Sequence, residues 1–173
     1  MITHMRAIMQ TSKGNFELEL FPESAPKSVA NFVNLAKSGF YDNVLFHRII
    51  RGFVIQGGDP TTKNGEGSSF TWGQNNGPVN LPLEIDRNLH NTTGTIALAN
   101  SGGPNSSGSQ FFVNLADNLF LDGNYTVFGK VVNGMEVVQA ISTISPVNPS
   151  SGTPMDTSAY VYIKKIEIIQ NKQ

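Results

Sequence analysis

The apolar residues of this chain occur in short runs separated by clusters of glycine, proline and asparagine. After residue 43 the runs are Val44–Ile50, Phe53–Gln56, Thr95–Asn100, Gln110–Asn114 and Val127–Val132. Runs of this length bounded by turn residues are typical of β-strands. Charged residues make up only 14% of the sequence, which disfavours a coiled coil or a long helical bundle. The sequence therefore predicts a mainly β protein that is rich in loops.

The first forty residues predict a β-hairpin followed by a helix. Residues 5–21 alternate apolar and polar side chains on both sides of a polar turn at 12–15, which is the period of a hairpin. Pro26 suits the first turn of a helix, because its missing N–H needs no partner there. The helical spacing then holds at Val29, Phe32, Val33, Ala36 and Phe40, with Gly39 as a stop. We expect a helix over residues 26–38.

The end of the chain predicts a second helix and a bulged strand. Apolar residues at helical spacing follow Gly134, namely Met135, Val138 and Ile141. The strand predicted over residues 160–169 changes phase at Lys164-Lys165, which indicates a bulge there. Many short strands with only two helices favour a closed barrel whose ends the helices cover. A length of 173 residues fits a single domain, 1–173, in which disorder is allowed for residues 1–4.

Composition excludes several classes of function. The net charge is −1 and no run of lysine or arginine occurs, so a nucleic-acid partner is not expected. The absence of cysteine excludes disulfides and Cys-based zinc sites. His4, His47 and His90 are not at metal-ligand spacing, so neither a metal nor any other cofactor is expected. The sequence shows neither a signal peptide nor a long apolar run, so we expect a cytoplasmic protein without membrane contact.

Three polar segments have both a structural and a functional interpretation. The glycine-rich stretch 102–108 runs into a strand-like segment and lacks the Lys-Ser/Thr ending of a phosphate loop, so we expect a connection between strands. The long polar stretches 57–82 and 143–159 are expected to carry function or to shape a site. Trp72, the only tryptophan, is expected to anchor the first of them.

Arg48 lies inside an otherwise apolar run, which is unfavourable for a guanidinium without partners. On this residue alone a structural arginine paired with a carboxylate is as good an interpretation as a functional one. The surrounding motifs favour function: the segments 46–59, 108–112 and 120–123 resemble the cyclophilin family of peptidyl-prolyl cis-trans isomerases. The resemblance covers nearly the whole chain, through the hairpin and the segments 25–32, 97–100 and 125–134.

The resemblance implies a closed eight-stranded antiparallel β-barrel capped by two α-helices, with the site on the outer surface of the barrel. It implies an enzyme that accelerates rotation of X-Pro bonds in peptides and folding proteins. Its catalytic residues would be Arg48, Phe53 and Gln56. Its substrate-binding residues would be His47, Val54, Ala99, Asn100, Gln110, Phe112, Phe120, Leu121 and Tyr125.

Two site positions depart from the pattern of many eukaryotic cyclophilins. Phe120 stands where they have Trp and Tyr125 where they have His, and both are similar to the short bacterial-type members. Because Phe120 lacks an indole N–H, we expect cyclosporin to bind weakly. Gly102-Gly103 adds one residue to a rim loop.

Two alternatives to the enzyme stay open at the level of the sequence. The first is a chaperone or scaffold module that binds proline peptides with little turnover. The second is a barrel with a small ligand in its lumen, which would need a large apolar cavity. A monomer is expected, because no exposed apolar stripe argues for a dimer.

Overall fold

The computed structural model describes residues 4–144 and 160–171. Within these residues eight strands form one sheet, accompanied by two α-helices and two short 3₁₀ turns. The sequence analysis allowed for disorder in residues 1–4. Residues 1–3 lie outside the described residues, whereas His4 is the first residue of β1. The elements are β1 (His4–Thr11), β2 (Gly14–Leu20), α1 (Pro26–Lys37), β3 (Arg48–Ile50), β4 (Val54–Gly57), β5 (Thr95–Leu98), β6 (Phe111–Asn114), β7 (Val127–Asn133), α2 (Met135–Ser142) and β8 (Ile163–Asn171).

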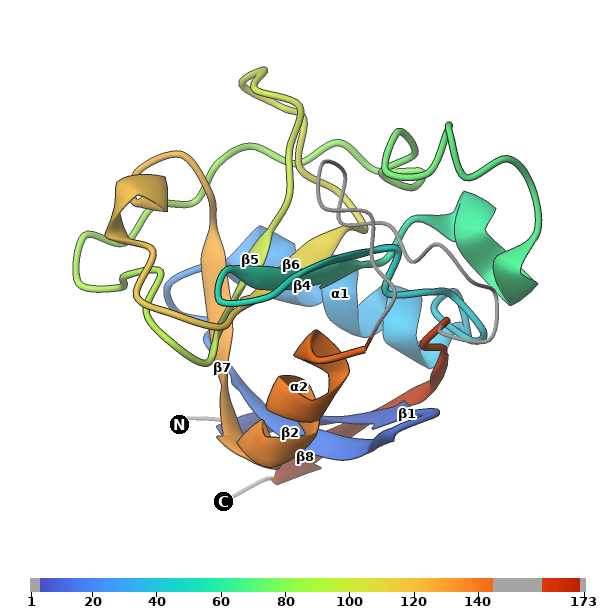
Figure 1. Cartoon of the computed structure of the whole chain (residues 1–173). Helices are drawn as coiled ribbons and strands as arrows, with labels where there is room; N and C mark the ends of the chain where they lie inside the picture. The colour runs from blue at the N-terminus through green and yellow to red at the C-terminus, as the bar shows by residue number, and fades with distance from the viewer. Residues whose placement is uncertain (1–3, 145–159, 172–173) are drawn as a thin grey trace.

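The sheet is antiparallel throughout, in the order β3-β4-β6-β5-β7-β2-β1-β8. In Figure 1, β1, β2 and β8 lie at the bottom of the view, and β4, β5 and β6 lie across its middle. The two outer strands, β3 and β8, do not pair along a full ladder. Instead the barrel closes through an isolated bridge between Leu45 and Tyr162, just before each of these strands.

This closure explains why β3 is shorter than the apolar run that predicts it. The Phe46 N–H donates to the Val161 carbonyl at 3.0 Å, and the Val44 carbonyl accepts from the Ile163 N–H at 2.9 Å. Residues 44–46 therefore bond to residues 161–163, where the chain enters β8, and only Arg48–Ile50 pair with β4. The remaining short runs lie in strands close to their expected bounds, and the mainly β fold is confirmed.

Both predicted helices are confirmed, and each buries one face. Helix α1 has Pro26 in its first turn and buries the predicted stripe of Val29, Phe32, Val33 and Ala36. It packs on β8, while α2 packs on β2, β3 and β4. In Figure 1, α2 lies in front of the sheet and α1 behind β4. The barrel is thus covered from two sides, as expected.

The barrel interior is filled with aromatic and aliphatic side chains. Phe32 of α1 stands at its centre, with ring centroids 5.2 Å from Phe128, 5.6 Å from Tyr41 and 6.0 Å from Phe111. All four side chains are buried. Close packing of this kind leaves no room for a ligand among these rings, so the lumen alternative loses its support.

The phase change in the last strand is confirmed as a bulge. Gln10 pairs with Lys165 and Thr11 pairs with Ile163, so Lys164 has no partner on β1. The extra residue lets Ile163 and Ile166 both face the core, with two exposed lysines between them. A bulge therefore reconciles two registers of one apolar pattern.

The two long polar stretches differ in how much of them the structure describes. In the first, the Trp72 Nε1–H donates to the Glu66 carbonyl at 3.2 Å, and its ring meets Tyr160 edge-on at 5.4 Å. Trp72 is thus a loop anchor, as predicted. Most of the second stretch, 145–159, lies outside the described residues. The segment 102–108 is part of the connection between β5 and β6, as predicted.

Candidate active site

The site lies on the outer face of β3, β4, β6 and β5. Alternation along these strands sends Ile49 and Ile55 into the core and the neighbouring side chains outward. Val54, Ala97, Phe112 and Val127 form a second apolar cluster on that outer face, separate from the main core. Strand β6 is therefore buried on both faces, which is why its sequence does not alternate.

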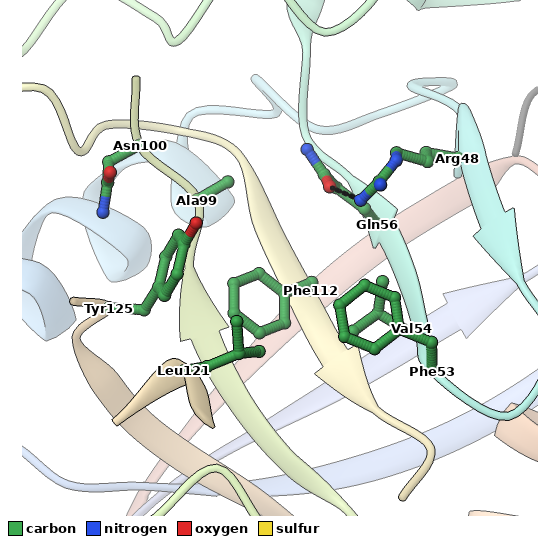
Figure 2. Close-up of a pocket in the computed structure, with 9 residues that line it drawn as sticks. All are labelled: Arg48, Phe53, Val54, Gln56, Ala99, Asn100, Phe112, Leu121 and Tyr125. Carbon is green, nitrogen blue, oxygen red and sulfur yellow. Dashed lines mark hydrogen bonds between the residues drawn. The ribbon is translucent and has the colours of Figure 1, made fainter. Parts of the chain in front are cut away.

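A cavity of about 180 Å³ opens on this outer cluster. Figure 2 shows Phe53, Val54, Phe112 and Leu121 grouped around its apolar part, with the polar residues on the other side. Phe112 meets the Tyr125 ring edge-on, with centroids 5.4 Å apart. Among the described residues, those that line the cavity are Arg48, Phe53, Val54, Gln56, Ala99, Asn100, Phe112, Leu121 and Tyr125.

Arg48 is the one charged side chain in that lining. It is directly opposite Gln56 in the pairing of β3 with β4, so both side chains share the outer face. The Arg48 Nη1–H donates to Gln56 Oε1 at 3.3 Å (Figure 2). Within residues 4–144 and 160–171 no ion pair joins Arg48 to a carboxylate. The alternative of a carboxylate-paired structural arginine is therefore wrong for this part of the chain.

The rim opposite Arg48 is built on the loop after β5. Asn100 Nδ2–H donates to the Asn124 carbonyl at 2.8 Å, and its Oδ1 accepts from the Gly102 N–H at 3.0 Å. These bonds tie the rim loop to the segment that carries Tyr125. The Ala99 N–H bonds to the Gln110 carbonyl at 3.0 Å, which keeps the rim in line with β6.

Three expected site residues do not line the cavity. His47 is 3% exposed and lies behind the site, and neither ring nitrogen has a hydrogen-bond partner among the described residues. Phe120 is 72% exposed and stacks on Phe53 with centroids 5.9 Å apart. Gln110 lines a neighbouring polar cavity of about 450 Å³ and accepts a hydrogen bond from Gln56 at 3.0 Å.

Burial changes the ionisation of His47. Removal from water disfavours the imidazolium and lowers the pKa of His47 to about 4. The Asp59 carboxylate opposes this change, and the Arg48 guanidinium adds to it. His47 is therefore a neutral, buried side chain next to a cationic site.

Buried asparagines, which the sequence interpretation missed, fix by hydrogen bonds the segment that precedes Leu121. Asn118 Nδ2–H donates to the Phe53 carbonyl at 3.0 Å and to Asn114 Oδ1 at 2.9 Å. Asn114 in turn donates to Asn91 Oδ1 at 3.1 Å. The available signal was Asn114 at the end of an apolar strand, where a polar side chain needs buried partners.

The described residues hold no group of three or more His, Asp or Glu side chains that could bind a metal ion. The helices of the described part are all too short or too polar to cross a bilayer. With one fixed cation, amide groups and an apolar cavity, this site is suited to binding and electrostatic stabilisation.

Comparison with known proteins agrees with this chemistry. Residues 6–168 match the family described as "Cyclophilin type peptidyl-prolyl cis-trans isomerase/CLD". The chain is 42% identical over 161 residues to the "Peptidyl-prolyl cis-trans isomerase-like 1" of Aspergillus fumigatus, covering 92% of this chain and 94% of that protein. It is 44% identical over 149 residues to the "Peptidyl-prolyl cis-trans isomerase ppi1" of Schizosaccharomyces pombe, covering 86% and 90%.

Solved structures give the same result. A Cryptosporidium parvum cyclophilin type peptidyl-prolyl cis-trans isomerase superimposes with a TM-score of 0.81 at 34% identity, covering 98% of this chain and 99% of that chain. Its structure in the presence of the dipeptide Ala-Pro gives a TM-score of 0.80 at 34% identity, covering 96% and 99%. The fold, the family match and the relatives together show that this chain belongs to the cyclophilin-type peptidyl-prolyl cis-trans isomerases.

Proposed function

We propose that Arg48 is the catalytic group of this isomerase and that the cavity beside it binds the proline of an X-Pro bond. The observation that carries the proposal is the position of a single guanidinium at the edge of an apolar cavity, bonded to an amide rather than to a carboxylate. Its charge is therefore not neutralised within the site.

Isomerisation breaks no bond, so the enzyme has only to lower the barrier to rotation about the X-Pro amide bond. Amide resonance sets that barrier at about 18–20 kcal/mol, whereas cis and trans X-Pro differ by only about 0.5–1 kcal/mol. In the twisted amide the prolyl nitrogen regains a lone pair. A donor aimed at this nitrogen binds the twisted form more tightly than the planar one, which lowers the barrier. Arg48 supplies such donors and is permanently charged.

The cavity walls supply the second part of the mechanism. Phe53, Phe112 and Leu121 hold the pyrrolidine ring and exclude water, which strengthens the contact to Arg48. Gln56 and Asn100 lie on the polar side, where they contact the residue that precedes proline as it rotates. The apolar walls hold the proline while the polar side guides the preceding residue as it turns, so the rotation requires both surfaces.

The test is the rate of cis-to-trans exchange in an Ala-Pro tetrapeptide, for wild type and Arg48→Ala. One charge-assisted hydrogen bond contributes about 1.5–3 kcal/mol, so we expect a loss of roughly 10- to 150-fold in kcat/KM. Arg51→Ala is the matched control, because Arg51 follows three residues later and bonds to the Thr143 carbonyl at 2.9 Å, away from the cavity. It should retain full activity at equal stability.

Two outcomes would contradict the proposal. A folded wild type that binds the peptide without accelerating exchange would be the low-turnover chaperone or scaffold module. Equal activity of wild type and Arg48→Ala would remove Arg48 from the mechanism.

We also propose proline-containing peptides and folding proteins as substrates, weak binding of cyclosporin, a single domain, a monomeric state and a cytoplasmic location. The exposed Phe120 ring supports weak binding of cyclosporin, because it offers no N–H donor. Sedimentation of the purified protein tests the monomeric state, and imaging of a tagged copy tests the cytoplasmic location.

A further inference from the structure

Gln110 is 3% exposed, and every polar atom of its side chain is bonded inside the protein. Its Nε2 donates to the Gly73 carbonyl at 2.9 Å and to the Asn75 carbonyl at 2.8 Å. Its Oε1 accepts from Gln56 Nε2 at 3.0 Å. Both N–H groups are thus in use, and Gln110 has no free donor to offer a bound peptide.

These bonds allow only one orientation of each amide. Carbonyl oxygens only accept, so the group of Gln110 that faces Gly73 and Asn75 must be its NH₂. Its oxygen then faces Gln56, which must present its own NH₂. The Gln56 oxygen is left for Arg48, whose guanidinium only donates. Each group therefore donates to the next in one direction: Arg48 to Gln56, Gln56 to Gln110, and Gln110 to the loop that contains Gly73 and Asn75.

A buried carboxylate fixes the loop at the far end. Asp59 is fully buried, and its Oδ2 accepts from the Gly73 N–H at 2.6 Å and from the Asn75 N–H at 3.3 Å. Its Oδ1 accepts from the Thr61 N–H at 2.8 Å. The loop thus turns its N–H groups toward Asp59 and its carbonyls toward Gln110.

We infer that Gln110 and Asp59 are positioning residues of the isomerase, which act on catalysis by fixing the orientation of Gln56 and through it the Arg48 guanidinium. We call the connected groups of Asp59, Gly73, Asn75, Gln110, Gln56 and Arg48 the amide relay. The inference rests on the proposed role of Arg48. It assigns Gln110 to positioning instead of the direct peptide contact expected from the family resemblance.

The amide relay matters because the reaction depends on a preorganised cation. Without Gln110, the Gln56 amide can turn over and present its NH₂ to a guanidinium that has nothing but donors. Arg48 would then lose its acceptor and occupy several positions. Because stabilisation of the twisted amide needs a fixed donor, the rate falls while the apolar cavity still binds proline.

The first experiment replaces Gln110 by methionine, which keeps the length of the side chain and removes its polar atoms. For Gln110→Met we expect kcat to fall about tenfold while KM stays within about twofold. Gln74→Met is the matched control: the same change at an exposed residue on the edge of the neighbouring cavity, outside the amide relay. It should leave kcat unchanged. An unaltered kcat in Gln110→Met would overturn the inference.

The second experiment separates positioning from a general structural effect. Gln110→Met is combined with Arg48→Ala, and exchange is followed by NMR at high enzyme concentration. If Gln110 acts through Arg48, its replacement changes nothing further in the Arg48→Ala background. A similar tenfold loss in both backgrounds would overturn the inference. Full activity of Arg48→Ala alone would instead contradict the proposed function.

The third experiment does not depend on activity. In wild type the Gln56 side-chain NH₂ has one fixed partner, so its two ¹H–¹⁵N resonances should be shifted apart and exchange slowly with solvent. Asp59→Asn should collapse this signature, whereas Thr61→Val, which removes only a 2.6 Å bond to the other Asp59 oxygen, should preserve it. Retention of the signature in a folded Asp59→Asn would remove Asp59 from the amide relay.

Discussion

His47 makes the stability of this protein depend on pH in the range between about 6.5 and about 4. The side chain is 3% exposed, its ring nitrogens have no partner among the described residues, and its pKa falls to about 4. In the unfolded chain the pKa of histidine is about 6.5. The unfolded state therefore binds the proton more readily, and acid favours unfolding.

The magnitude follows from these two values. Well above pH 6.5, the pKa of histidine in the unfolded chain, His47 is neutral in both states and its full contribution is present. As pH falls toward 4, the unfolded state protonates first and the unfolding free energy decreases. At about 1.4 kcal/mol for each pKa unit, the total loss is roughly 3 kcal/mol, of which about 2 kcal/mol falls between pH 7 and pH 5.

The measurement is urea unfolding at pH 7 and pH 5, followed by the fluorescence of Trp72 and by circular dichroism. Wild type should lose about 2 kcal/mol more than His47→Gln across this interval, because glutamine does not titrate. The same change at the exposed His4 controls for the removal of a histidine. Equal losses in wild type and His47→Gln would refute the argument that burial keeps His47 neutral.

Two further predictions concern a backbone position and a ligand contact. Gly58→Ala should lower the unfolding free energy by more than about 2 kcal/mol, because φ is +94° and the new methyl would collide with the Ser109 carbonyl. Gly52→Ala, at φ +71° with open space around it, should cost only about 1 kcal/mol in the same urea titration. Phe120→Trp should tighten cyclosporin binding roughly tenfold by restoring an indole N–H. Calorimetry would measure this affinity, and an unchanged affinity would contradict the assumed contact.

Local patterns predicted most of the fold, because they record which side of each element is buried. The hairpin, both helices and the bulge at Lys164-Lys165 all follow from spacing within one segment. The closure of the barrel does not. It depends on backbone bonds between residues 44–46 and 161–163, and a backbone bond leaves no mark on side-chain identity.

Arg48 was the only member of the proposed site that its own sequence context indicated, because there a cation interrupts an apolar run. All nine residues that line the cavity were named through the family resemblance. Spacing alone could not have grouped them, since the cavity forms where β4, β6 and β5 come together across long loops. The supporting amides, Asn91, Asn114 and Asn118, were missed because a buried asparagine looks like any loop asparagine until its partners are known.

The location of the proposed site on the outside of the barrel follows from how the inside is filled. Phe32 and Phe111 occupy the centre with their rings 6.0 Å apart, so binding requires a second apolar surface. Strand β6 provides it, because Phe111 points inward and the adjacent Phe112 points outward into the cavity. Polar substitution at Phe112 would thus abolish the binding surface while leaving the inner packing in place. A strand with two apolar faces in a barrel with a filled core is therefore a sign of an external site.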